Sequence, residues 1–67
     1  MIGKIHKKID NDFGYIIDAE GKLYLFSTND ILDDTKLVIG TFVYFKPEED
    51  KILKATYISK LEEELWI

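Results

Sequence analysis

Short runs of alternating apolar and polar residues, separated by clusters of turn-forming residues, make up most of this chain. Such alternation is typical of β-strands that bury one face. Turn formers are concentrated at 10–12, 18–21 and 47–51, where Asp, Asn, Gly or Pro gather. The pattern predicts strands at 2–9, 13–17, 22–26, 41–45 and 52–59.

The alternation breaks between Ser27 and Gly40, and again after Ser59. In the first break, Ser27, Thr28 or Asn29 can cap a single helical turn through 30–32, followed by a loop. After the last strand, residues 60–67 contain helix formers, with Leu61 and Leu65 four positions apart. The sequence therefore predicts a barrel domain over 1–59 and a short helical tail over 60–67 that packs on the barrel.

Five short strands with a long third connection predict an all-β fold, a small closed or nearly closed barrel. Closure removes the strand edges that an open sheet would expose. An SH3-like barrel of this length is an alternative. We expect the inward-facing residues to be Ile5, Ile16, Leu23, Leu25, Val43, Phe45 and Ile58, with Ile31 and Leu37 filling one end.

Aromatic residues of the second and third strands form the most informative cluster. If the aliphatic residues of these strands point inward, alternation sends Phe13, Tyr15, Tyr24 and Phe26 to one outer face. This face has two interpretations. It is either a second small core, covered by the tail or another subunit, or a platform on which unpaired bases stack. In the second case the basic residues of the first strand flank it: Lys4, His6, Lys7 and Lys8.

Charge and composition narrow the function. The chain has 67 residues, a net charge of −4 and no Cys, which fits one domain without disulfides. All nine basic residues are Lys. Lys meets a phosphate as a point charge but lacks the bidentate fork with which Arg reads guanine in duplex DNA. Sequence-specific binding of duplex DNA is therefore not expected.

Catalytic chemistry has little support in the sequence. The chain has one His, no Cys, no nucleophile elbow and no spacing typical of a metal site. We therefore predict no enzyme activity, no metal or other cofactor and no small-molecule substrate. The N-terminus has no signal-peptide pattern, and no apolar run is long enough to span a membrane. The default expectation is a cytoplasmic protein.

Three segments together resemble the cold-shock domain: Gly3-Lys4-Ile5, Asn11-Asp12-Phe13-Gly14-Tyr15-Ile16 and Leu23-Tyr24-Leu25-Phe26-Ser27. Members of that family are five-stranded antiparallel OB-type barrels that bind single-stranded RNA and DNA. Their first motif runs roughly Lys-Gly-(Phe/Tyr)-Gly-Phe-Ile and their second roughly Val-Phe-Val-His-Phe. Gly40 to Phe45 is similar to the family's fourth strand. The resemblance implies an OB-type fold and single-stranded nucleic acid as the partner.

The chain also departs from the family pattern. His6-Lys7-Lys8 stands where the family has Lys-Trp-Phe, and Asn11-Asp12 replaces the leading Lys-Gly of the first motif. The second motif aligns in two ways. Alternation matches Phe26 to the family's His, whereas a shift of one residue matches it to the Phe that follows.

The sequence thus predicts a monomer that binds single-stranded RNA, in preference to DNA, with little sequence specificity. The resemblance implies a role as an RNA chaperone or regulator of gene expression. The predicted binding residues are Lys4, His6, Lys7, Lys8, Phe13, Tyr15, Tyr24 and Phe26. The alternative is a protein-interaction module on the same barrel, which the net acidity and the lost stacking positions favour.

Overall fold

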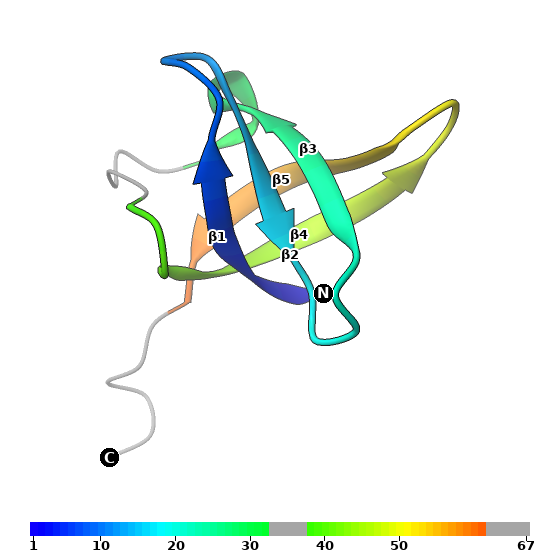
Figure 1. The fold of residues 1–67 in the computed structure, drawn as a ribbon, viewed down its shortest axis with the longest axis horizontal. Helices are drawn as coiled ribbons and strands as arrows, with labels where there is room; N and C mark the ends of the chain where they lie inside the picture. Colours follow the sequence, from blue (N-terminus) through cyan, green and yellow to red (C-terminus); the bar gives the residue numbers. More distant parts are fainter. Residues whose placement is uncertain (33–37, 62–67) are drawn as a thin grey trace.

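The computed structural model describes residues 1–32 and 38–61 and contains five strands and one short 3₁₀ helix (Figure 1). They are β1 (Ile2–Lys8), β2 (Phe13–Ile17), β3 (Leu23–Ser27), η1 (Thr28–Asp30), β4 (Phe42–Glu49) and β5 (Leu53–Lys60). The strands form a closed barrel in the order β1-β2-β3-β5-β4. The predicted all-β barrel is confirmed.

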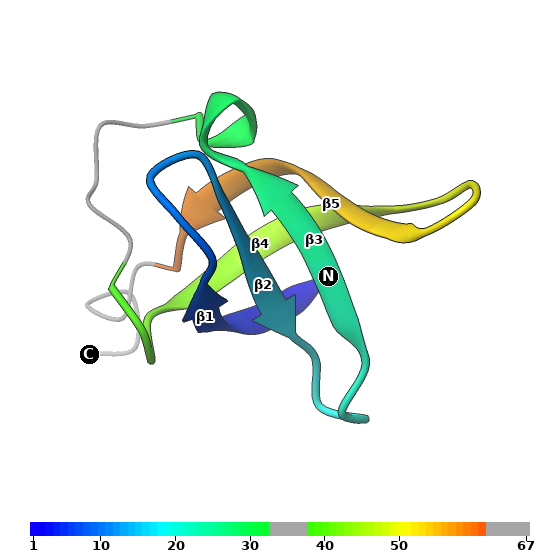
Figure 2. The ribbon, with the colours of Figure 1, turned by 45° about the horizontal axis from the view of Figure 1, so that its top comes forward.

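Antiparallel pairing joins every neighbouring pair of strands except β3 and β5. Those two strands run parallel, with Leu25 opposite Lys54, and close the barrel. In Figures 1 and 2, β4 and β5 cross behind β1, β2 and β3 at a steep angle. The outer side of β1–β3 and the outer side of β4 are therefore separate surfaces.

Strand β4 extends further than the sequence indicates, because it passes through Pro47 to Glu49. Pro47 lies opposite Ala55 of β5, beyond the part of β4 that pairs with β1. Its missing N–H therefore leaves no hydrogen bond unmade on the β1 side. The predicted turn at 47–51 is shorter in the structure, and the β4–β5 hairpin is correspondingly longer.

The core combines residues from every strand of the barrel. The buried side chains are Ile5, Ile16, Tyr24, Phe26, Val43, Phe45, Ala55 and Ile58. Five of the residues predicted to face inward are confirmed: Ile5, Ile16, Val43, Phe45 and Ile58. Ile31 packs against this core and is partly buried, as expected. The predicted core residue Leu37 lies outside the described residues.

The predicted facing of β3 is wrong. Tyr24 and Phe26 are only 3% and 2% exposed, whereas Leu23 is 42% exposed and Leu25 lies on the outer side. The cause is the pairing register, which sets Tyr24 opposite Ile16. Directly opposed residues of an antiparallel pair share one face of the sheet, so Tyr24 points inward with Ile16.

Glycine makes room for these buried rings. A Cβ on Gly14 would lie 2.8 Å from two ring atoms of Phe26 and 2.7 Å from the carbonyl oxygen of Lys7. A Cβ on Gly3 would lie 2.6 Å from Ile16 and 2.8 Å from the ring of Phe45. Neither position can carry a side chain without a shift of these neighbours. Because Gly14 has none, the ring of Phe26 on β3 fits directly opposite it.

Two β-bulges interrupt the alternation. Between the pairs Ile5–Ile16 and Lys7–Tyr15, β1 has one extra residue, His6. Between Tyr44–Ser59 and Lys46–Thr56, a single residue of β4 faces Tyr57 and Ile58 of β5, and Tyr57 has a positive φ of 51°. Each bulge changes which residues of its strand point outward.

The predicted helical tail lies almost wholly outside the described residues. Strand β5 extends to Lys60, and the backbone N–H of Leu61 donates a hydrogen bond to the carbonyl oxygen of Phe42 at 3.0 Å. The chain thus follows β4 up to its last described residue. In the described ranges, no helix has the length and apolar character that a membrane span requires.

Candidate nucleic-acid interface

A row of four side chains crosses the outer side of the barrel from β1 to β5. Pairing sets Lys7 opposite Tyr15, Tyr15 opposite Leu25, and Leu25 opposite Lys54. Neighbouring strands lie about 4.8 Å apart, so the row extends over roughly 14 Å. We call these four residues the Tyr15 row. It has an apolar centre and an ammonium group at each end.

Phe13 continues this surface next to Tyr15. Its side chain is 44% exposed, and it lies opposite Ser27 of β3. The turn before it is held by Asp10, whose Oδ1 accepts hydrogen bonds from the N–H groups of Asp12 and Phe13 at 2.8 and 2.9 Å. The structure thus places both predicted aromatic residues of β2 on the outer side, at the end of a fixed turn.

The bulge at His6 brings Lys7 to this surface. Strict alternation from the buried Ile5 would point Lys7 inward, but the extra residue restores it to the outer side opposite Tyr15. Lys8 follows at the exposed end of β1, opposite Gly14. His6 is itself exposed as the extra residue of the bulge. Of the predicted basic residues, Lys7 is the one that pairs directly with an aromatic residue, Tyr15.

Lys4 belongs to a different part of the surface. It lies opposite Ile17 on one side and Phe42 on the other, and its Nζ is 5.9 Å from the centroid of the Phe42 ring. An ammonium group over an aromatic face is a cation–π contact. The contact draws Lys4 toward β4 and away from the Tyr15 row.

Tyr24 and Phe26 are buried and do not lie on the outer side, which corrects the prediction that four aromatic residues share that side. Their places on β3 are taken by Leu23 and Leu25. This facing favours the second alignment of the cold-shock motif, in which Phe26 matches the final Phe and Leu25 stands at the His. The outer side of β2 and β3 therefore has two aromatic rings, Phe13 and Tyr15, beside Leu23 and Leu25.

Tyr24 still shapes the rim of the barrel through its hydroxyl. This hydroxyl donates to Oδ2 of Asp18 at 3.1 Å, and its ring lies 5.0 Å from that of Phe45. Oδ1 of Asp18 accepts hydrogen bonds from the N–H groups of Glu20 and Lys22. The hydrogen bond from Lys22, together with those from Tyr24 and Glu20, lowers the pKa of Asp18 although burial opposes it. Burial, and then Asp18, raise the pKa of Tyr24.

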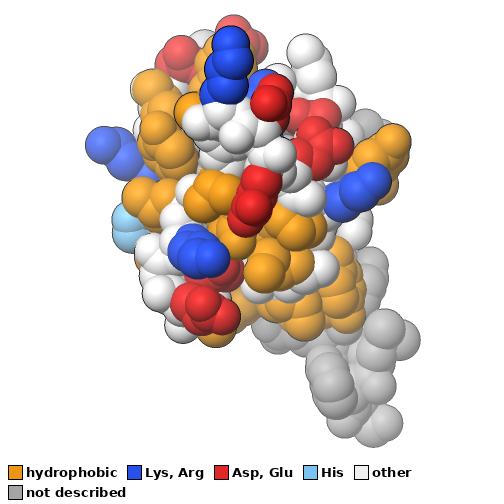
Figure 3. Space-filling model, turned by 90° about the vertical axis from the view of Figure 1, so that its right-hand side faces the viewer, with side chains coloured by type: hydrophobic (Ala, Val, Ile, Leu, Met, Phe, Trp, Pro, Cys, Tyr) orange, Lys and Arg blue, Asp and Glu red, His pale blue; other side chains and the backbone are white. Residues whose placement is uncertain are grey.

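Opposite charges are mixed on the surface. Figure 3 shows one side of the barrel, on which apolar side chains are bordered by both lysines and acidic residues. Asp12 directly precedes Phe13, and Asp30 of η1 lines a pocket with Phe13 and Lys54. Salt screens exposed charges more than about 8–10 Å apart. The electrostatic potential at the Tyr15 row is therefore set by the charged side chains close to it and not by the net charge of the chain.

Two residues of this surface, Leu25 and Lys54, are not among the binding residues predicted from the sequence. Alternation backward from the buried Ile58 would place Lys54 inside, and only the bulge at Tyr57 and Ile58 reverses this. A signal was present, because an unpaired Lys is almost never fully buried. A lysine at an inward position indicates a break in alternation between 54 and 58.

The geometry defines an OB-type barrel with the fold of a cold-shock domain. Its fold matches that of the structure of Drosophila Unr CSD456, with a TM-score of 0.81 and 23% sequence identity. The match covers 92% of this chain and 26% of the Unr chain, so this chain spans about a quarter of that structure. No protein-family model matches the chain, and the search of curated proteins found no significant match.

Within the ranges that the structure describes, no group of three or more His, Cys, Asp or Glu side chains could hold a metal ion.

Proposed function

We propose that this chain binds single-stranded nucleic acid on the outer side of β1, β2, β3 and β5. The Tyr15 row carries this proposal. Its centre offers an aromatic ring and an aliphatic side chain to the faces of unpaired bases, and its two ends offer ammonium groups to phosphates. Phe13 adds a second exposed ring next to the row.

Stacking on these rings does not depend on base identity, because every base has a π-face. The chain therefore binds with little overall sequence preference. RNA is the proposed ligand in the cell, on the strength of the resemblance to cold-shock domains. Weak binding of unpaired bases opposes their pairing, which is the property of an RNA chaperone. The chain acts as a monomer, since one row is complete within one barrel.

The affinity follows from the number of contacts. Two rings instead of four remove stacking contributions of about 1–3 kcal/mol each. A dissociation constant on the order of 10 µM is therefore expected for an oligonucleotide of about seven bases. Three lysines near the surface, Lys7, Lys8 and Lys54, predict a slope of about −2 for log K against log salt, at roughly −0.7 per contact.

A titration of fluorescein-labelled heptauridine, followed by anisotropy at several salt concentrations, tests this function. Saturable binding at about 50 mM salt with the predicted slope supports it. Absence of binding at that salt concentration refutes it. The same titration with oligo-dT measures the preference for RNA.

The alternative function, a protein-interaction module, is favoured by a second surface. The outer side of β1 and β4 exposes Ile2, Phe42 and Tyr44 at 49%, 47% and 45%. Next to them, a groove of about 480 Å³ is lined by Ile2, Lys4, Ile17 and Phe42 among others. An apolar partner would bind there. Failure of an oligonucleotide to shift any backbone resonance of β2 or β3 would favour this alternative over the Tyr15 row.

A further inference from the structure

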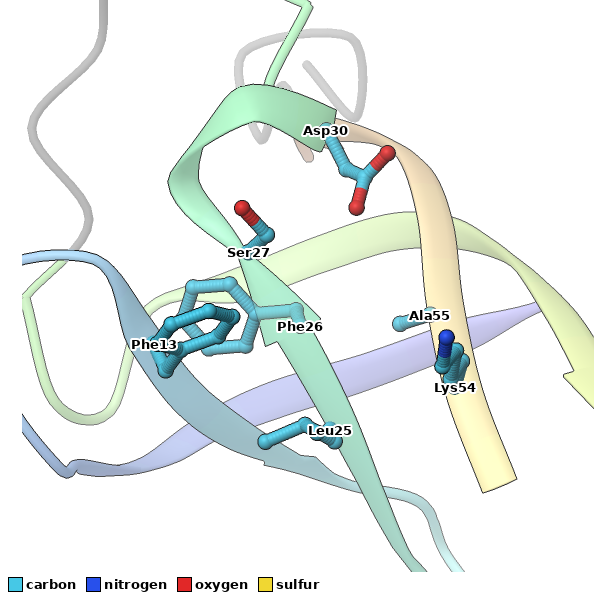
Figure 4. A pocket seen from close by; sticks show the side chains of 7 residues that line it. All are labelled: Phe13, Leu25, Phe26, Ser27, Asp30, Lys54 and Ala55. Atoms are coloured by element: carbon cyan, nitrogen blue, oxygen red, sulfur yellow. The ribbon is translucent and has the colours of Figure 1, made fainter. Parts of the chain in front are cut away.

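A small pocket opens at the Phe13 end of the proposed interface, between β3, η1 and β5. Its volume is about 110 Å³, and it is lined by Phe13, Leu25, Phe26, Ser27, Asp30, Lys54 and Ala55. In Figure 4 the rings of Phe13 and Phe26 stand on one side, Lys54 and Ala55 on the other, and Asp30 extends from η1 above them. We call it the Phe13 pocket. It has an aromatic wall and polar groups from two separate elements.

The polar groups of the Phe13 pocket are available to a ligand. Among the described residues, neither the Asp30 carboxylate nor the Lys54 ammonium has a hydrogen-bond or ion-pair partner. Oγ of Ser27 accepts a hydrogen bond from the N–H of Asn29 at 3.2 Å, which leaves its own proton free to donate. The pocket thus presents one charged acceptor, the Asp30 carboxylate, and two donors, the Lys54 ammonium and the Ser27 hydroxyl.

The carboxylate selects among the bases by their donor groups. An ionised carboxylate only accepts hydrogen bonds and can take two parallel donors at once. Guanine presents such a pair on its Watson–Crick edge, the N1–H and the 2-amino group. Uracil presents a single N–H flanked by two carbonyl oxygens. These oxygens carry partial negative charge, so a carboxylate placed at this edge of uracil is repelled by them. Unpaired bases are read on this edge in single-stranded RNA.

The charge of Asp30 does not exclude an anionic strand from the pocket. Lys54 lines the same pocket, so the ammonium and the carboxylate balance each other at its mouth. Lys54 also ends the Tyr15 row, where a phosphate is proposed to lie. A base that stacks on Phe13 can then direct its Watson–Crick edge toward Asp30 while its phosphate stays near Lys54.

We infer that the Phe13 pocket is a guanine-preferring subsite, in which Asp30 accepts hydrogen bonds from the N1–H and the 2-amino group. The inference rests on the proposed function and deepens it. One position of the bound strand prefers guanine, while the remaining positions are read by stacking alone. Asp30 is thus the specificity-determining residue of an otherwise unselective surface.

The test compares labelled heptauridine with heptamers in which a single guanine replaces uracil at each position in turn. At one or two positions, guanine is expected to tighten binding about fivefold to tenfold. Inosine, which lacks the 2-amino group, should lose most of this gain at the same position. Asp30→Asn should abolish the preference for guanine, whereas the matched control Asp12→Asn, which removes the same charge beside Phe13, should retain it. Asp12 lies beside Phe13 but does not line the pocket.

The outcomes separate this inference from the proposed function. Binding of heptauridine without any guanine preference, or a preference that survives in Asp30→Asn, overturns the subsite and leaves the proposed function standing. Failure to bind any of the heptamers overturns both. Loss of the preference in Asp12→Asn as well would assign it to general charge instead of to Asp30.

Discussion

Strands β2 and β3 lie side by side in the barrel and use their aromatic residues in opposite ways. On β2, Phe13 and Tyr15 point outward and the residues between and beyond them, Gly14 and Ile16, point inward. On β3, Tyr24 and Phe26 are buried while the aliphatic residues face outward. The same pattern of alternating aromatic residues thus leaves two rings on the outer side of one strand and buries two rings in the next.

The difference shows that alternation defines two faces of a strand but does not say which one is buried. On β3 both faces carry large apolar side chains, so hydrophobicity alone does not distinguish them. The neighbouring strand β2 determines which face of β3 is buried. Gly14 leaves a space that the ring of Phe26 fills, whereas an outward Phe26 would leave this space empty. Empty space in a core costs free energy through lost contacts.

Replacing Phe26 tests the comparison with the largest expected effect. Phe26→Ala removes a buried ring and should lower the free energy of unfolding by about 3–5 kcal/mol. In a small domain of marginal stability, a loss of this size leaves a large share of the molecules unfolded. Phe13→Ala, a matched change on β2, should alter it far less because the ring is half exposed. Urea unfolding followed by circular dichroism measures both. Equal losses for the two variants would contradict the assignment of the faces.

Gly14→Ala tests the space opposite Phe26. The new Cβ would lie 2.7 Å from the backbone oxygen of Lys7, which cannot move without shifting β1. A loss of about 1–3 kcal/mol is expected from overpacking. Gly21→Ala is not a neutral control because Gly21 has a positive φ. Ala19→Gly, at an exposed turn position, serves instead. An unchanged unfolding midpoint for Gly14→Ala would refute this account of the space.

Leu25→Phe sharpens the comparison from the other side. Because Leu25 faces outward between Tyr15 and Lys54, a ring there extends the stacking surface without crowding the core. Binding of heptauridine should strengthen by about 1 kcal/mol, at the low end for one stacked base, with stability nearly unchanged. Anisotropy titration and thermal unfolding check the two parts. A strong destabilisation would mean that Leu25 points inward after all.

The smallest expected effect concerns pH and the rim of the barrel. The pKa of Asp18 lies below its ordinary value of 3.8, so its carboxylate stabilises the fold above this pH. That contribution is lost as the pH falls through the lowered pKa of the folded state. Asp18→Asn should therefore flatten the decline of stability below about pH 4 relative to the unaltered chain. Melting temperatures from pH 2 to 7 make the comparison.

Much of the fold could be predicted from the sequence, and less of the site. Turn clusters fix the strand positions, and Ile5 lies between two polar residues, Lys4 and His6, which leave only one choice of inward face at that point. The site depends on features that alternation cannot show. The bulge at His6 turns Lys7 outward, and the bulge at Tyr57 turns Lys54 outward. A bulge arises from pairing between strands, and its one sign within a single strand is a charged residue at an inward position, such as Lys54.

The most direct test of the central claim compares two phenylalanines of nearly equal exposure on different sides of the barrel. Phe13 on β2 is 44% exposed, and Phe42 on β4 is 47% exposed. If bases stack on the outer side of β2 and β3, Phe13→Ala should weaken binding of labelled heptauridine by about 1–3 kcal/mol, roughly fivefold or more. Phe42→Ala should leave binding within about twofold. A loss of affinity in Phe42→Ala that equals or exceeds the loss in Phe13→Ala would contradict the proposed interface.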